Sequence, residues 1–393
     1  MWSYSLLKLM DFRGIRVFVP EGGKQALATI RGLKELGCHV TVACGSKHNA
    51  CYASKLPDNK ILFKDLFLDV DATFLFYLEQ AKGGNYDVLM PIGEKSTSIV
   101  NSHEDEFKIY AKVACAPMKA YIQVFNKQNT FDKAIEIGTP CPYTRHSKQA
   151  LENYLKKAKF PLIIKPRQGV GSIGFHKFET ETELRAYLAK PDFNIDDYVL
   201  QEFVEFDHRI GTLVFMDEQG NVCTSYNTDV LRQFPPDAGS AILIKTTQAK
   251  EIQDCFVQLL RELHWQGYAA GCFMIEKGTG NPKLLEINGR IPATVKLAYK
   301  CGFNIARQML EMVYGEKVTQ YPYYTGKDLY VRHFDTDLAW FVKSKDRFRS
   351  KPSWFSWKDT CDVLYSRDDP RPFWSNLWEN LLQYRSKMKQ KKH

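Results

Sequence analysis

The 393-residue sequence has little net charge outside its C-terminus and no long apolar run. Its 54 Lys and Arg exceed its 45 Asp and Glu by nine, and five of these nine charges lie within residues 385–393. A basic stretch at a chain end is typical of a solvated terminus, so we expect no nucleic-acid-binding groove. The most apolar window, residues 66–78, is interrupted by Asp69 and Asp71, which excludes a transmembrane segment there.

The sequence also lacks any C-x-x-C pair among its ten cysteines. Without paired spacing, the cysteines indicate neither a zinc site nor a disulfide framework. The first residues contain no apolar stretch long enough for a signal peptide. We therefore expect a reduced, cytoplasmic, soluble protein whose cysteines are mostly small buried apolar residues. Their positions are Cys38, Cys44, Cys51, Cys115, Cys141, Cys223, Cys255, Cys272, Cys301 and Cys361.

The first 115 residues lack the G-x-G-x-x-G fingerprint, so they do not predict a dinucleotide site. They do predict a βαβ unit. A β-rich run at residues 15–19 ends in a glycine turn, a helical pattern over 26–36 follows, and a second strand is expected at 38–44. Another strand is expected at 87–91. This order of elements predicts a parallel sheet, and the chain length predicts two or three packed units.

A glycine-rich hairpin follows in the middle of the sequence. The apolar strand at residues 160–165 ends in Lys165, and residues 175–178 form the expected returning strand. Glycines let backbone N–H groups approach an anion, and Lys165 adds an ammonium group. Phosphate binding and simple turn geometry explain this loop equally well. The candidate phosphate-binding residues of the loop are Gly169, Gly171, Ser172 and Gly174.

Polar side chains also gather on one face of the strand expected at residues 283–287. Because the side-chain period of a strand is two, Glu286, Asn288 and Arg290 share that face. Carboxylate and amide oxygens suit magnesium, and a guanidinium is able to clamp a phosphoryl group. A polar solvent-facing edge strand is the alternative. We expect residues 273–276 to pair antiparallel with this strand.

Together with Lys127 on a helix that ends at Gly138, these features make residues 116–312 resemble the ATP-grasp superfamily. The resemblance implies that Lys127 and Lys165 bind the phosphates of ATP and that the glycine-rich loop covers them. It assigns Glu286 and Asn288 to magnesium, with manganese as the alternative ion. It also implies a hinge strand whose backbone binds adenine, formed by Gln201, Glu202 and Val204.

The resemblance further implies a mixed α/β and α+β fold. We expect a Rossmann-like domain over residues 12–115 and a two-lobed ATP-grasp domain over 116–320, with a lid lobe at about 125–200 and a metal-binding lobe at about 201–320. Residues 321–393 form a Trp-rich extension with a basic tail and contain five of the seven tryptophans. Packing over the preceding domain and contact with a partner or membrane surface are both compatible with these indoles.

Two positions depart from the superfamily pattern. Where many members place an acid for the ribose hydroxyls, this sequence has Arg209, with Asp207 nearby. Where they place the first metal-binding acid, it has Met274. Glu276 lies on the same strand face as Met274, so we predict that Glu276 and Glu286 lie within one metal ion's span if the hairpin pairs in a shifted register. A solvated Glu276 is the alternative.

The resemblance implies an ATP-dependent ligase that joins a carboxylate to an amine through an acylphosphate and releases ADP and phosphate. Arg290 and Arg232 are the candidate catalytic residues, although a surface position for Arg232 is equally compatible with the sequence. The alternatives are a carbamoyl-phosphate-synthase-like carboxylate kinase and a non-catalytic ATP-binding protein. The implied partners are small-molecule carboxylates and amines, and a homodimer is compatible with the sequence.

Overall fold

The structure is a computed structural model that describes residues 10–169, 174–235 and 239–390. The chain divides into two compact units, each built from segments that are distant in the sequence. Unit 1 contains residues 1–115, 302–320 and 363–393, and unit 2 contains residues 116–301 and 321–362. The division after residue 115 coincides with the expected domain boundary. The expected C-terminal extension, by contrast, is shared between the two units.

Unit 1 is built on a five-stranded parallel sheet with the strand order β3-β2-β1-β4-β5. The predicted βαβ unit and parallel sheet are therefore confirmed. The strands are β1 (Arg16–Val19), β2 (His39–Cys44), β3 (Asn59–Leu62), β4 (Val88–Leu89) and β5 (Lys112–Val113). The helices are α1 (Lys24–Glu35), α2 (Ala50–Ala53), α3 (Val70–Gly83), α4 (Glu94–Ser102), α5 (Glu104–Lys108), α12 (Ile305–Val313) and α14 (Arg371–Gln390).

The central strands of unit 1 are buried along most of their length, which explains their continuous apolar sequence. Helix α1 between them ends before Gly37, whose φ of 79° lies in the left-handed region that glycine adopts without strain. Phe18 of β1 packs in one core with Phe76 and Tyr77 of α3. Local sequence signals and tertiary packing therefore agree in this unit.

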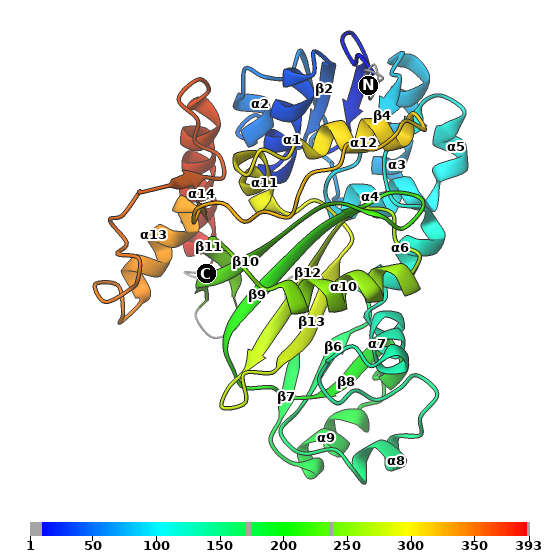
Figure 1. The fold of residues 1–393 in the computed structure, drawn as a ribbon, viewed down its shortest axis with the longest axis vertical. Helices are drawn as coiled ribbons and strands as arrows, with labels where there is room; N and C mark the ends of the chain where they lie inside the picture. The colour runs from blue at the N-terminus through cyan, green and yellow to red at the C-terminus, as the bar shows by residue number, and fades with distance from the viewer. Residues whose placement is uncertain (1–9, 170–173, 236–238, 391–393) are drawn as a thin grey trace, which may run out of the picture. The chain divides into compact units, whose positions relative to one another are not determined.

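Unit 2 contains a seven-stranded sheet with the order β13-β12-β9-β10-β11-β14-β15, antiparallel except for the β14–β15 pair. Figure 1 shows α10 (Lys250–Glu262) lying across this sheet, and Phe256 of α10 packs with Val214 and Phe273 in the core between them. The strands are β9 (Phe206–Met216), β10 (Val222–Phe234), β11 (Ser240–Thr247), β12 (Gly267–Glu276), β13 (Pro282–Asn288), β14 (Tyr330–Arg332) and β15 (Thr360–Asp362). The expected antiparallel pairing of 273–276 with 283–287 is confirmed.

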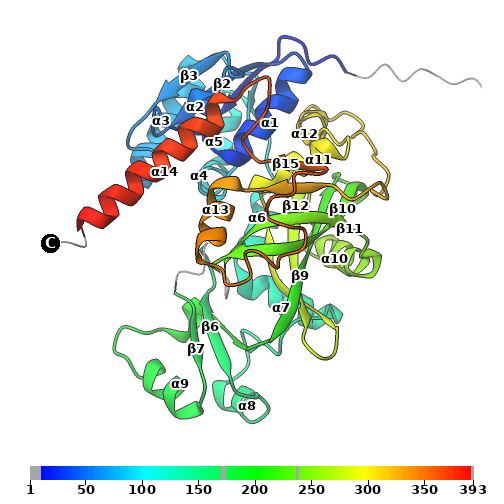
Figure 2. The same cartoon turned by 90° about the vertical axis from the view of Figure 1, so that its left-hand side faces the viewer.

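A smaller three-stranded sheet, β7-β6-β8, forms the second part of unit 2. Figure 2 shows α8 (Leu151–Leu155) and α9 (Glu181–Leu188) beside it, and Tyr154 and Leu184 pack on its apolar face. Its strands are β6 (Leu162–Pro166), β7 (His176–Phe178) and β8 (Tyr198–Glu202). The remaining elements of unit 2 are α6 (Met118–Phe125), α7 (Lys127–Ile137), η1 (Ile195–Asp197), η2 (Ala293–Val295), α11 (Lys296–Lys300) and α13 (Phe334–Lys343).

The tryptophans after residue 320 lie in contrasting environments. Trp340 of α13 is buried, and Trp354 packs on the guanidinium of Arg332, 4.4 Å from ring centroid to Cζ. Trp374 and Trp378 of α14 are 62% and 53% exposed. The burial of Trp340 and the ring contact of Trp354 favour packing, whereas the exposure of Trp374 and Trp378 leaves the expected partner contact as a prediction. Within the described residues, no helix is both long and apolar enough to cross a membrane.

Candidate active site

Lys165 connects the two sheets of unit 2. Its Nζ donates a 2.9 Å hydrogen bond to the carbonyl oxygen of Leu285 on β13, and it lies 4.5 Å from the ring centroid of Phe131. Burial lowers the pKa of Lys165 to about 8, although the nearby carboxylate of Glu286 favours the charged form. A desolvated ammonium beside a single carboxylate is a favourable place for an anionic ligand.

Lys127, the first residue of α7, approaches the same place from the helix. Its Nζ donates a 2.8 Å hydrogen bond to the carbonyl oxygen of Gly169, and its backbone N–H donates to the carbonyl oxygen of Arg167 at 2.8 Å. Asn126 caps the helix by accepting from the backbone N–H of Gln128. The charge of Lys127 contributes to the low pKa of Lys165. The two predicted phosphate-binding lysines therefore lie near each other at the base of the glycine-rich loop.

The described ends of the glycine-rich loop have left-handed backbone conformations. Gly169 has φ 118° and Gly174 has φ 78°, and a Cβ at Gly174 would lie 2.8 Å from Cγ of Pro166. A larger residue at position 174 is therefore disfavoured by both strain and contact. Gly171 and Ser172 lie outside the described residues, so their expected phosphate contacts remain predictions.

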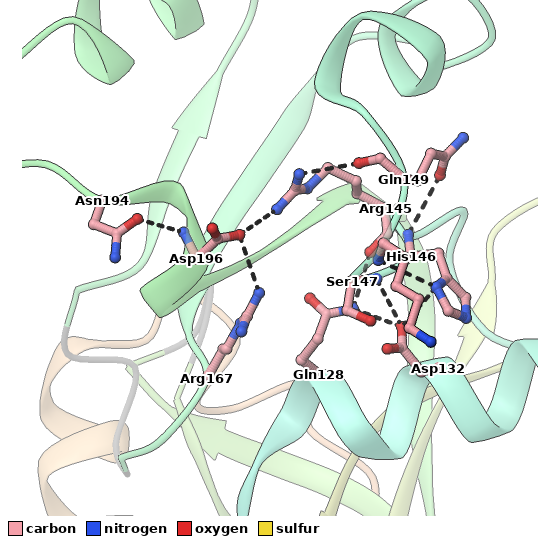
Figure 3. A network of polar contacts seen from close by, with 10 residues as sticks. Gln128, Asp132, Arg145, His146, Ser147, Gln149, Arg167, Asn194 and Asp196 are labelled. Carbon is pink, nitrogen blue, oxygen red and sulfur yellow. Dashed lines mark hydrogen bonds and ion pairs between the residues drawn. The ribbon is translucent and has the colours of Figure 1, made fainter.

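An ion-pair network fixes the start of this loop (Figure 3). Arg145, which is almost completely buried, donates from Nη2 to Oδ1 of Asp196 at 3.0 Å. Arg167 donates from Nη2 to the same oxygen at 3.5 Å. Because Arg167 precedes the loop by two residues, Asp196 restrains the strand end from which the loop departs. Sequence reasoning missed this network, since its members are up to 51 residues apart and form no short motif.

A second group of contacts in Figure 3 restrains the start of α7. Oδ1 of Asp132 accepts hydrogen bonds from Nε2 of Gln128 at 2.8 Å and from the backbone N–H of Ser147 at 3.1 Å. Nε2 of Gln128 also donates to the carbonyl of Arg145 at 2.9 Å. Since Gln128 follows Lys127 directly, these bonds fix the position from which Lys127 extends.

The expected hinge lies at the end of β8. The side chain of Gln201 is buried and donates to Oγ1 of Thr144 at 2.7 Å, and Oε1 of Glu202 accepts from the backbone of Lys159 at 2.9 Å. The side chains of Gln201 and Glu202 thus both make hydrogen bonds to other residues of the protein. The chain then leaves the small sheet through buried Val204 and enters β9. Adenine binding by the backbone of this segment stays a prediction.

The polar residues of β13 share one face, as predicted for Glu286 and Asn288. Nδ2 of Asn288 donates to Oε1 of Glu286 at 3.3 Å. Arg290 follows the strand, and its positive charge lowers the pKa of buried Tyr268 on the neighbouring strand β12, although burial raises that pKa more. Arg290 therefore lies near the neighbouring strand at the end of the Glu286–Asn288 face.

Glu276 does not lie beside Glu286, so the predicted pair of metal-binding carboxylates is wrong. The β12–β13 register sets Cys272 opposite Glu286 and Ile275 opposite Pro282. Four residues of strand separate positions 272 and 276, which corresponds to about 13 Å. Oε2 of Glu276 instead accepts a 2.6 Å hydrogen bond from Oγ1 of Thr279 in the hairpin turn. The predicted pairing required a different β12–β13 register. The bond between Glu276 and Thr279 stabilises the turn that sets the observed one.

Arg232 is a buried structural residue, which contradicts its predicted contact with substrate. Only 5% of it is exposed, and its Nε and Nη2 donate to Oδ1 and Oδ2 of Asp337, both at 2.8 Å. Asp337 also pairs with Arg332 at 2.5 Å, and both of these side chains are fully buried. No local sequence pattern predicts this pairing, because Asp337 follows Arg232 by 105 residues.

The donor set fits one magnesium ion that also binds phosphate. Glu286 offers a carboxylate and Asn288 an amide oxygen, both hard ligands of the kind magnesium prefers. Among the described residues, no group of three or more His, Cys, Asp and Glu side chains is arranged to hold a metal by itself. A magnesium ion held by Glu286 and Asn288 would have water or ligand oxygens at its remaining coordination positions.

Comparisons with known proteins agree with this geometry. Residues 124–294 match the family model of the ATP-grasp domain. The fold is similar to that of the Campylobacter jejuni biotin carboxylase in its β-γ-ATP complex (TM-score 0.63, 18% identity, covering 78% of this chain and 72% of that one). It is also similar to the biotin carboxylase domain of Hydrogenobacter thermophilus 2-oxoglutarate carboxylase in complex with MgADP, ADP and bicarbonate. For this domain the TM-score is 0.64 and the identity 18%, and the match covers 78% of this chain and 71% of that one. No curated protein matches the sequence.

Proposed function

Because residues 124–294 form an ATP-grasp domain, we propose that this protein is an ATP-dependent ligase that joins a carboxylate to an amine through an acylphosphate. The observation that carries this proposal is the approach of Lys165 to the strand of Glu286. In the first step, a carboxylate oxygen attacks the γ-phosphorus and ADP leaves. The amine nitrogen then attacks the carbonyl carbon, releases phosphate and loses a proton to solvent.

Each residue of the site has a separate role in the proposed reaction. Lys127 and Lys165 bind the phosphate oxygens with charge-assisted hydrogen bonds, and Arg290 orients the acceptor carboxylate or the transferring phosphoryl group. Glu286 and Asn288 would hold magnesium, which supplies neutralisation of the phosphate charge. Holding the reacting oxygen in line with the γ-phosphorus is the main contribution of the protein.

The proposal includes the parts of the chain that surround this site. Gly171 and Ser172 are assigned to the phosphates of ATP by the resemblance, and the backbone at residues 201–204 is assigned to the adenine edge. The parallel sheet of unit 1 corresponds to the Rossmann-like domain expected before the ATP-grasp domain. Its strand order reverses between β1 and β4, which supports this comparison.

A second candidate is phosphorylation of bicarbonate without ligation to an organic acid. The observation that favours it is the fold similarity to biotin carboxylase domains, one of which was crystallised with bicarbonate. The first chemical step is the same in both candidates, because bicarbonate also attacks the γ-phosphorus through oxygen.

The experiment is a panel of carboxylates tested with full-length protein and Mg-ATP, each with and without a panel of amines that includes ammonia. We expect release of ADP with one carboxylate only when its amine is present. Turnover with bicarbonate alone or with ammonia supports the second candidate. Release of AMP and pyrophosphate contradicts both. Lys165→Ala should abolish the signal, whereas Lys156→Ala, an exposed lysine of the same lobe, should retain it.

A further inference from the structure

The strand next to Glu286 offers no oxygen ligand directly opposite Glu286 or Asn288. Across the β12–β13 pair, Cys272 is opposite Glu286 and Ala270 is opposite Asn288. Met274, two residues along on the same face of β12, is almost completely buried. Thiol and thioether sulfur are soft ligands that bind magnesium poorly. Within the described residues, the part of this face beside Cys272 therefore provides the carboxylate of Glu286 alone, because Glu276 lies about 13 Å further along β12.

A guanidinium lies on the other side of β12. Strand β9 pairs with β12 so that Arg209 is opposite Met274 and Gly211 is opposite Cys272. Arg209 therefore lies one side-chain position from Cys272 along the shared face, and Glu286 lies opposite Cys272 on the β13 side.

The guanidinium of Arg209 is only partly satisfied by the protein. Its Nη2 donates to the carbonyl of Gly239 at 2.9 Å. Its Nε is buried and has no hydrogen-bond partner among the described residues. Leaving a charged donor buried without an acceptor is costly, so an anionic ligand at this point stabilises the site.

The spacing of Arg209 and Glu286 suits a phosphate group with a metal ion. The two residues lie on strands β9 and β13, which flank β12, so their backbones are about 10 Å apart across the sheet. Gly211 of β9 has no side chain beside Cys272, and Oγ1 of Thr228 from β10 lies 2.5 Å from where a Cβ of residue 211 would be. Terminal phosphates at this place would meet a metal ion on the β13 side and a guanidinium on the β9 side.

We infer that Arg209 binds the terminal phosphates of ATP and takes the place of a second divalent ion, so that ATP binds with one ion held by Glu286 and Asn288. This inference rests on the proposed ATP-binding function. Arginine suits the role because its charge is permanent and its planar N–H groups match phosphate oxygens. This role of Arg209 explains both departures from the superfamily pattern. Position 274 needs no metal-binding acid when one ion is bound, and position 209 carries the positive charge that replaces the second ion.

The test counts ions rather than turnover. Full-length protein is dialysed to equilibrium against Mn²⁺ and the β,γ-imido analogue of ATP, and bound Mn²⁺ is divided by bound nucleotide. We expect a ratio of one for the natural sequence and for the control Met274→Leu. Met274→Glu, which adds a carboxylate to the face, should raise the ratio towards two. A ratio of two in the natural sequence overturns the inference while leaving the proposed function intact.

Affinity provides the second arm of the test. Arg209→Met should weaken nucleotide binding about 10- to 100-fold, and Arg209→Lys should weaken it less because the charge is retained. Arg261→Met, at an exposed arginine of α10, serves as the control. Thermal melting without nucleotide shows whether each variant is folded. Undiminished binding by folded Arg209→Met overturns the inference, and absence of nucleotide binding by the natural protein overturns the proposed function together with it.

Discussion

Lys165 lies against the strand that carries Glu286, because its Nζ donates to the carbonyl of Leu285 across 120 residues of sequence. This bond joins the three-stranded sheet to the edge of the seven-stranded sheet within unit 2. The ammonium and the carboxylate therefore come together only when both sheets are formed.

Replacing Lys165 by Ala should weaken binding of ATP about 10- to 100-fold, since a charge-assisted hydrogen bond to phosphate is lost in a desolvated site. Lys127→Ala should weaken binding by a similar factor. Isothermal titration calorimetry measures both effects, with Lys156→Ala as the matched control. Equal affinities of all four proteins would contradict the assignment of the two lysines.

The affinity for ATP should fall as the pH rises above 8. Burial lowers the pKa of Lys165 from 10.5 to about 8, so the ammonium becomes neutral above pH 8 in the free protein. We expect about tenfold weaker binding at pH 9 than at pH 7 and proton uptake on binding at pH 8.5. Lys165→Met should remove the proton uptake. Proton uptake that persists in Lys165→Met would assign the titration to another group.

The same pKa shift makes a prediction about stability. Because the folded-state pKa lies below the unfolded-state value, folded Lys165 binds fewer protons than unfolded Lys165 between pH 8 and 10.5. Its destabilising contribution is therefore fully present below pH 8 and is relieved as the pH rises. In urea denaturation, the natural protein should gain stability relative to Lys165→Met between pH 7.5 and 9.5. A difference that does not change with pH would contradict the shift.

Much of the fold was predictable because its signals are local. The apolar run before Lys165, the glycines that follow it, and the alternation around Glu286 each identify a strand or turn within about ten residues of sequence. Arg232 and Glu276 were misjudged because their partners depend on tertiary contacts. Asp337 is remote in sequence, and the hairpin register that removes Glu276 from the site is set by its turn together with an irregularity between Cys272 and Phe273.

Glu286→Gln should weaken the binding of Mg²⁺ to the nucleotide complex, because the carboxylate of the predicted metal site is removed. Glu276→Gln should leave it unchanged, since Glu276 bonds to Thr279 in the hairpin turn. The measurement is the Mg²⁺ concentration that gives half-maximal binding of an ATP analogue. An effect of Glu276→Gln as large as that of Glu286→Gln would contradict the hairpin register.

The buried cluster around Asp337 should govern stability rather than nucleotide binding. Asp337→Asn leaves two buried guanidiniums, Arg232 and Arg332, without their carboxylate and should cost about 3–5 kcal/mol of unfolding free energy. Arg232→Met leaves Asp337 paired with Arg332 and should cost less, about 2 kcal/mol. Urea denaturation gives both values. Loss of ATP affinity in folded Arg232→Met would restore the catalytic assignment of this residue.

Asp196→Asn should loosen the start of the glycine-rich loop, because both Arg145 and Arg167 lose their ionic acceptor. The carboxylate is largely exposed, so we expect a small loss of stability, about 1 kcal/mol, together with weaker ATP binding. Asp192→Asn, an exposed residue of the same lobe, is the control. Unchanged affinity in Asp196→Asn would show that the network does not position the loop.

The acylphosphate is tested most directly by following oxygen from the substrate. The carboxylate identified by the ADP-release panel is labelled with ¹⁸O on both oxygens and incubated with full-length protein, Mg-ATP and the amine, and the products are analysed by ³¹P NMR. The proposed reaction transfers one ¹⁸O to each phosphate released, with ADP formed in equal amount. Unlabelled phosphate, or label found in AMP, would contradict it.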